Sequence, residues 1–144
     1  MAIPFTYREL RNANLLTYNG WSVASKTNAH RLLLFYSVEC GLKAVYLKRM
    51  NLDLFDSSTV SEKMFSHDIN HLLDELKAGR GLRLTSHFEL PLYKKNGKLI
   101  SRKPLSSELN QAWRYGGKLI DPENDEVFEQ QLCKISDWIK GELR

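Results

Sequence analysis

The sequence predicts an all-α fold, a bundle of four to five helices with a short β-hairpin inserted between the third and the fourth. Three observations predict it. Residues 29–50 are apolar on nearly every side of a helical wheel, which indicates a helix buried among other helices. The flanking stretches repeat apolar residues at helical spacing. The pair Asn96-Gly97, flanked by two short apolar runs, is typical of a hairpin turn.

Length and composition indicate a single globular domain over residues 1–144. Hydrophobic residues make up 42% of the chain and charged residues 26%, which is a soluble, folded balance. No apolar run approaches the roughly 20 residues that cross a bilayer. We therefore expect a cytoplasmic protein without a membrane segment. The cysteines Cys40 and Cys133 lie within apolar helical patterns, so we expect reduced core thiols rather than a disulfide.

The first helix is expected from Thr6 to about Tyr18, with Thr6 as its N-cap and Asn19-Gly20 ending it. The central helix then covers 29–50 and begins at one of several polar residues. The candidate caps are Ser22, Ser25, Thr27 and Asn28.

Three residues interrupt the apolar surface of the central helix. Glu39 precedes Lys43 by four residues, the favourable spacing for a helical ion pair. Gly41 costs about 1 kcal/mol relative to alanine inside a helix, which points to a close approach by another segment. That segment belongs either to the same chain or to a second subunit. We therefore assign Glu39, Gly41 and Lys43 to a cleft or dimer interface, with an ion pair that fixes helix register as the alternative.

A third helix is expected from a Ser66 cap to about Lys77, with Gly79 ending it. His67 and His71 lie four residues apart here, which is a metal-ligand spacing. However, no HExxH arrangement and no obvious third ligand accompany them. We therefore expect no metal, and no other cofactor.

The pattern changes to two short strands over about 84–103, which form the hairpin. A fourth helix follows from Leu105 to a buried Trp113 and ends at Gly116-Gly117. The last helix carries Asp121 as its predicted N-cap, with Pro122 in the first helical position.

Positive charge concentrates in one segment. Residues 77–118 hold ten basic residues against two acidic ones, a formal charge of +8, so the remainder carries −4 of the net +4. Such a segment indicates a polyanionic partner, because neutralising phosphates gives affinity that is independent of sequence. A solvated basic hairpin is the alternative. The residues assigned to nucleic-acid or phosphate binding are Arg83, Lys94, Lys95, Lys98, Arg102, Lys103, Arg114 and Lys118.

Together, Arg31 to Tyr36, Glu39 to Ala44 and the His67-Asp68 opening of the third helix resemble the HEPN family of small helical domains. The resemblance covers about residues 29–77 and, beyond them, only the order of helices. It implies a HEPN-like bundle that is often dimeric and is found in prokaryotic toxin–antitoxin and antiviral defence systems, often beside a nucleotidyltransferase. Many members are metal-independent ribonucleases that use an Arg-x4–6-His motif composed across the dimer.

Arg80 and His87 are the pair at that spacing in this chain, with six residues between them. The resemblance thus assigns His87 as the acid or base and Arg80 as the group that stabilises charge on phosphorus. The first functional hypothesis is a HEPN-like protein that binds RNA or a nucleotide and, if catalytic, is an endoribonuclease. The alternative is a catalytically inactive HEPN-like structural or regulatory subunit that binds a partner protein through its helices or basic hairpin. Under either hypothesis a homodimer is expected.

Overall fold

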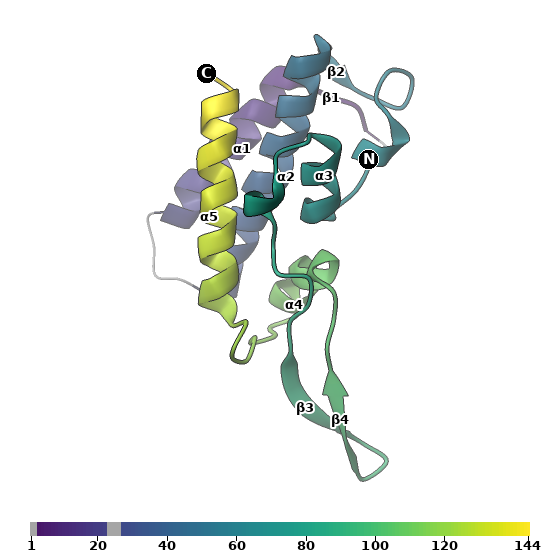
Figure 1. Ribbon diagram of the computed structural model, residues 1–144, viewed down its shortest axis with the longest axis vertical. Coiled ribbons are helices and arrows are strands. Elements are labelled where there is room, and N and C mark those ends of the chain that lie inside the picture. Colours follow the sequence, from purple (N-terminus) through teal and green to yellow (C-terminus); the bar gives the residue numbers. More distant parts are fainter. Residues whose placement is uncertain (1–2, 23–26) are drawn as a thin grey trace.

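The computed structural model describes residues 3–22 and 27–144, and its longest helices lie side by side (Figure 1). The five α-helices of this described part are α1 (Tyr7–Ser22), α2 (Asn28–Met50), α3 (Ile69–Glu75), α4 (Leu109–Arg114) and α5 (Asp125–Glu142). The strands are β1 (Phe5–Thr6), β2 (Leu54–Phe55), β3 (Leu90–Lys95) and β4 (Lys98–Arg102). Three 3-10 turns, η1 (Glu62–Met64), η2 (Arg80–Leu82) and η3 (Ser106–Glu108), join them.

The central helix α2 is the core of the molecule, because α1, α3, α4 and α5 all pack against it. Eleven of its residues are buried, and they lie on several sides of the helix, as its apolar composition predicts. Thr27 is the N-cap, one of the four candidates, while Ser25 lies outside the described residues. Asn51 ends the helix in the left-handed conformation, with φ of 53°.

The all-α prediction is wrong: the protein is a small α+β domain with two antiparallel two-stranded sheets. One sheet is the hairpin β3–β4, which lies between α3 and α4. The other pairs β1 with β2, so that Phe5 lies opposite the buried Phe55. This sheet joins the start of α1 to the connection after α2. The sequence shows no strand signal in that connection and predicts a loop there. Strands of two residues are too short to show an alternating pattern.

Packing also moves two helix ends from their predicted places. Helix α1 continues through Asn19-Gly20 to Ser22, and this added turn packs against α2, where a Cβ at Gly20 would lie 2.8 Å from Leu33 Cδ1. Helix α5 begins at Asp125 rather than beside Pro122. Its N-cap is Asn124, whose Oδ1 accepts from Val127 N.

Helix α3 is shorter than predicted, with Asp68 as its N-cap in place of Ser66. Helix α4 is preceded by a 3-10 turn and ends before Gly116, which has φ of +80°. Trp113 is buried, and its Nε1 donates to Asp125 Oδ1 over 2.8 Å, so α4 is fixed to the start of α5. Within residues 3–22 and 27–144, no helix combines the length and the apolar character that crossing a membrane requires.

Candidate nucleic-acid interface

Strands β3 and β4 form a two-stranded arm, Leu90–Arg102, that extends away from the helices (Figure 1). We call it the basic arm. Its turn residues Asn96 and Gly97 have φ of 53° and 77°, the two left-handed conformations of a type I′ hairpin turn. Pro91 interrupts the pairing, and the register shifts between Leu90 and Tyr93. All the arm residues from Pro91 to Leu99 are exposed.

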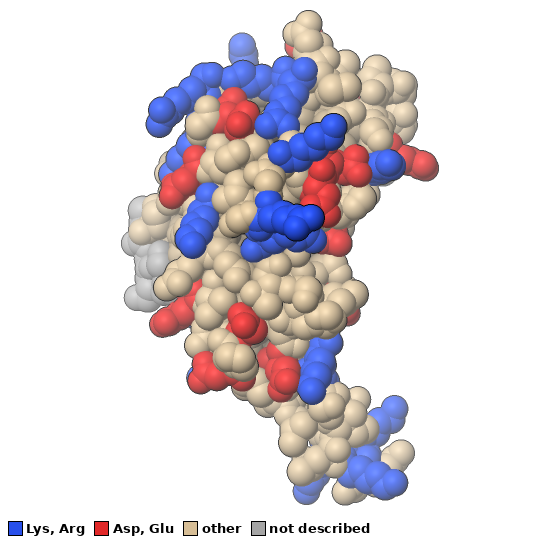
Figure 2. All heavy atoms as spheres, in the orientation of Figure 1, with Lys and Arg blue, Asp and Glu red and all other residues tan. Residues whose placement is uncertain are grey.

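The arm contains four cations and no acidic residue. Cross-strand register places Lys95 opposite Lys98, and Tyr93 opposite Ile100. Because side chains alternate between faces along a strand, Lys95, Lys98 and Arg102 share one face of the arm with Tyr93. Lys94, opposite Leu99, is on the other face. Figure 2 shows the resulting cluster of positive charge at the end of the arm.

The directly opposed lysines Lys95 and Lys98 are the unusual feature of this face. Like charges opposite each other in a sheet destabilise it. Lys94, Lys95 and Lys98 have no ion-pair or hydrogen-bond partner among the described residues. An anion placed between the two lysines would reduce this repulsion.

Arg102 is fixed across the arm. Its Nε and Nη2 donate to Pro91 O over 3.1 and 2.8 Å, and its guanidinium carbon lies 5.2 Å from the centre of the Tyr93 ring. The guanidinium retains N–H groups that these two bonds do not use. Arg102 therefore contributes both a fixed positive charge and a planar surface at the inner end of the arm.

The other residues assigned to phosphate binding lie outside the arm. Arg83 forms an ion pair with Asp74 of α3, and Lys103 Nζ lies 3.6 Å from Glu89 Oε1, so these two charges are partly neutralised. Lys118 is exposed. Arg114 donates from Nη2 to Tyr36 Oη over 2.5 Å. This bond raises the pKa of the guanidinium above its usual value.

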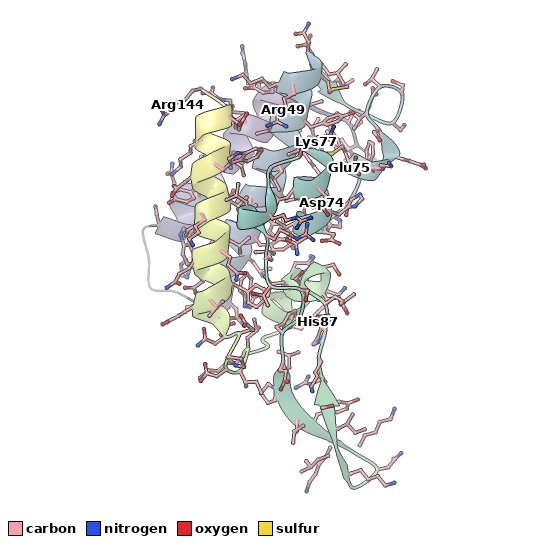
Figure 3. All side chains as sticks on the ribbon, in the orientation of Figure 1. Arg49, Asp74, Glu75, Lys77, His87 and Arg144 are labelled. Atoms are coloured by element: carbon pink, nitrogen blue, oxygen red, sulfur yellow. The ribbon has the colours of Figure 1, made fainter. Side chains whose placement is uncertain are left out.

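Arg80 and His87 lie in segments that contact different elements. Arg80 begins η2, which packs against α5, and it has no hydrogen-bond or ion-pair partner among the described residues. His87 lies where the chain leaves the helices for the arm (Figure 3) and bridges to Leu105. Between them, residues 83–85 have no regular secondary structure and the chain bends at Ser86 before the His87 bridge. No described contact joins the two side chains.

A cluster of ionisable groups lies instead between α2 and the start of α3. Glu39 Oε2 is 3.1 Å from Lys43 Nζ, which confirms the predicted ion pair, and Glu39 Oε1 is 2.9 Å from His67 Nδ1. Glu39 and Lys43 are buried, at 8% and 2% exposed, whereas the His67 side chain is 66% exposed. Lys43 Nζ also lies 5.4 Å from the centre of the Phe55 ring.

Two acceptor oxygens of one buried carboxylate are thus used by a lysine and a histidine. Since a carboxylate accepts, His67 donates from Nδ1, which leaves Nε2 facing solvent without a partner among the described residues. A histidine held by a carboxylate in this way can serve as a general acid or base. Sequence reasoning missed the role of His67, because its separation from Glu39 by 28 residues gives no periodic signal. His71 has a different partner, Lys63 O.

Gly41 is buried by segments of the same chain. A Cβ there would lie 2.7 Å from Asn14 Nδ2 of α1 and 2.8 Å from Ile139 Cγ2 of α5. The close approach that the glycine predicts is therefore made within one molecule, so Gly41 offers no surface to a second subunit. Glu39 likewise contacts His67, just before α3, and Lys43 contacts Phe55 of β2.

The described residues contain no group of three or more histidine, cysteine or acidic side chains able to hold a metal ion. Comparison of the chain with models of protein families, with curated proteins and with solved structures found no match.

Proposed function

We propose that this protein binds single-stranded RNA through the basic arm, as a HEPN-like member of a bacterial defence or toxin–antitoxin system. The observation that carries the proposal is the unpaired charge of the arm: Lys94, Lys95 and Lys98 are exposed with no acidic residue in the arm. The face shared by Lys95, Lys98, Arg102 and Tyr93 combines cations with an aromatic ring, as in proteins that hold a single strand by its phosphates and bases. The dimer and the nucleotidyltransferase partner remain predictions of the family resemblance.

Neutralising the arm tests this proposal. A triple variant with Lys94, Lys95 and Lys98 replaced by glutamine is expected to lose most RNA affinity in a fluorescence anisotropy titration. Its plot of log affinity against log salt should be shallower by about 2, because each phosphate contact to a single strand contributes roughly 0.7 to the slope.

The matched control replaces three exposed lysines outside the arm, Lys63, Lys77 and Lys134, and so changes the net charge equally. Retained RNA affinity in the control and loss in the arm variant supports the proposal. Equal losses in both variants would mean that net charge, rather than the arm, attracts RNA. If the wild-type protein binds an acidic protein partner but no RNA, the alternative of an inactive partner-binding subunit is correct.

A second candidate function is metal-independent RNA cleavage, which the fixed His67 imidazole favours. In this reaction His67 Nε2 removes the proton of a 2′-hydroxyl, the 2′-oxygen attacks phosphorus, and the bond from phosphorus to the 5′-oxygen breaks. Proton return to the 5′-oxygen gives a 2′,3′-cyclic phosphate and a 5′-hydroxyl. Glu39 holds the imidazole in place, because its carboxylate is itself fixed by Lys43.

The two histidine assignments make opposite predictions. In an assay with total RNA and EDTA, His67→Ala should abolish cleavage if the Glu39 cluster is catalytic, and His87→Ala or Arg80→Ala should do so if the Arg-x4–6-His pair is. All three side chains are exposed, so each substitution leaves the core intact. No cleavage by the wild-type protein rejects both assignments and leaves RNA binding as the proposed function.

A further inference from the structure

Two hollows meet at Phe88, at the foot of the basic arm, and they differ in chemistry. The larger, of about 320 Å³, is lined by the carboxylates of Glu89 and Glu123 beside Lys103 and His87. Its acidic groups disfavour an RNA strand. The smaller, of about 210 Å³, lies between the foot of the arm and α4, with Arg102 among its lining residues. We call it the α4 pocket.

We propose that the α4 pocket binds one unpaired base of the RNA strand that the arm holds. The inference rests on the proposed function and adds a base-binding site to it. The pocket is smaller than the roughly 300–1,000 Å³ of drug-sized sites, which suits a single planar ring system.

Part of the pocket wall is apolar, which suits contact with the flat faces of a base. Phe88, Leu90 and Ala112 line it, and of these Phe88 and Ala112 are buried. Gly117 closes one side, with its N–H donating to Ala112 O over 2.7 Å. A Cβ at Gly117 would lie 2.8 Å from that oxygen and 3.1 Å from Leu90 Cδ2. The glycine therefore lets the segment after α4 pass close to both walls without filling the pocket.

Two planar groups border the same space. Tyr115 is 79% exposed although it lines the pocket, and the Arg102 guanidinium is held in position by Pro91 O. Unpaired RNA bases stack on aromatic rings and on arginine guanidinium planes. The exposed Tyr115 ring beside an apolar wall is available to stack on a ligand.

Hydrogen-bonding groups for a base edge are also present. The Gln111 side chain lines the pocket, is exposed and has no partner among the described residues. Its amide supplies both donors and an acceptor, as the edge of a base requires. The pocket holds one acidic residue, Glu108, together with the cation Arg102, and Glu108 Oε1 accepts from Leu105 N over 3.3 Å.

Arg102 joins the pocket to the charged face of the arm. It belongs to the pocket wall and also shares the face that carries Lys95 and Lys98. Arg102 is four positions after Lys98 in β4, a distance of about 13 Å along the strand. An RNA strand whose phosphates contact the two lysines therefore extends along the arm toward the pocket.

The test uses two synthetic oligomers of nine ribose phosphodiester units. One has abasic sites throughout. The other is identical except for a single fluorescent 2-aminopurine at its central position. Base stacking on an aromatic side chain contributes about 5- to 150-fold in affinity. The wild-type protein should bind the 2-aminopurine oligomer more tightly than the abasic one by such a factor, and the fluorescence should be quenched on binding.

Tyr115→Ala should remove the preference and the quenching while it still binds the abasic oligomer, which shows that the variant is folded. Tyr115→Phe keeps the ring and should behave as wild type, and Gln111→Ala should reduce the discrimination between different bases at the central position. Equal wild-type affinity for the two oligomers, or an unchanged preference in Tyr115→Ala, overturns the pocket inference and leaves the arm proposal standing. Failure of the wild-type protein to bind either oligomer overturns both.

Discussion

Lys43 is a charged residue within the core, and the free-energy cost of burying it depends on its ion pair with Glu39. Its side chain is 2% exposed and its Nζ lies 3.1 Å from Glu39 Oε2. Replacing Lys43 by methionine preserves most of the packing but removes the ion-pair partner of the buried Glu39 carboxylate, which keeps its hydrogen bond with His67 Nδ1. Breaking a buried pair in this way costs about 3–5 kcal/mol, whereas replacing both partners by apolar residues is often neutral.

Urea denaturation should therefore show a large loss in the free energy of unfolding for Lys43→Met. The double variant Lys43→Met with Glu39→Leu should recover most of it. A double variant as unstable as the single one would mean that the lost lysine packing, rather than the unpaired carboxylate, causes the effect.

Cys40, next to Glu39, makes stability depend on alkaline pH. Burial, and then the negative charge of Glu39, raise the pKa of the thiol from its usual 9.0 to about 11. The unfolded chain releases this proton near pH 9 and the folded protein only near pH 11. The stabilising contribution is thus fully present below pH 9 and is lost as the pH rises to 11, by on the order of 2 kcal/mol.

Chemical denaturation of wild type and Cys40→Ala between pH 8 and 11 measures this effect. The difference in unfolding free energy between the two proteins should shrink over that range. A constant difference would show that the thiol titrates equally in both states. Alkylation of the folded protein by iodoacetamide should also be slow at pH 8, since the thiolate is the reactive form.

At the scale of elements, Gly41 sets how closely α1, α2 and α5 approach. Alanine is favoured over glycine inside a helix by about 1 kcal/mol, yet a Cβ here meets Asn14 Nδ2 at 2.7 Å and Ile139 Cγ2 at 2.8 Å. Asn14 cannot move away freely, because its Nδ2 donates to Ser37 O in the core. We expect Gly41→Ala to destabilise the protein by about 1–3 kcal/mol, as overpacking does.

Gly141 of α5 is the matched control for this substitution. It has nothing within 4 Å of an added Cβ, so Gly141→Ala should be neutral or stabilise the protein by up to about 1 kcal/mol. Thermal denaturation of both variants separates close packing from helix propensity. If both substitutions stabilise the protein, the helices shift to accommodate the methyl group, and the contact at Gly41 is not rigid.

The elements that the sequence predicts well are those with local signals. Asn96-Gly97 specifies its own turn, and the apolar surface of α2 requires burial wherever its partners lie. The β1–β2 pair could not be predicted, because a contact between Phe5 and Phe55 leaves no mark on two-residue strands. Asp121 resembles an N-cap locally, but its Oδ1 accepts from Asn124 Nδ2, and Asn124 caps α5.

The same distinction holds for the candidate sites. The spacing of Glu39 and Lys43 predicts their ion pair, and the Asn-Gly turn predicts the position of the arm lysines. Tertiary contacts add what spacing cannot show. His67 forms a hydrogen bond with Glu39, and Arg83 forms an ion pair with Asp74 instead of being free to bind phosphate. The α4 pocket is beyond sequence reasoning, since Arg102 of β4 meets Gln111 and Tyr115 of α4 and its C-cap only in the fold.

At the scale of the whole molecule, charge and packing are divided between the arm and the helical body. The arm carries a formal charge of +4 and no acidic residue, whereas the rest of the chain holds 17 basic and 17 acidic residues and is neutral in sum. Figure 2 shows acidic residues on the lower end of the body, next to the arm, and basic residues at the arm's far end. A polyanion approaching this face is attracted to the arm and repelled by the acidic residues beside it.

This division predicts that the arm can be removed without unfolding the body. Residues 91–101 contribute no buried side chain, and Leu90 lies opposite Arg102 at the foot of the arm. Replacing 91–101 with Asn-Gly closes the foot with a two-residue turn. Because little apolar area is lost, the melting temperature should change by less than about 4 °C, which corresponds to roughly 1 kcal/mol for a chain of this size.

RNA binding should be lost in the same variant, since it lacks Lys94, Lys95 and Lys98. A matched variant that keeps the arm's length but exchanges its four cations for glutamine should bind equally weakly, which separates charge from shape. Circular dichroism melting and anisotropy titration measure the two properties on the same samples. A body that unfolds without the arm would show that β3 and β4 stabilise the helices, and the arm would then be a structural element as well as a binding surface.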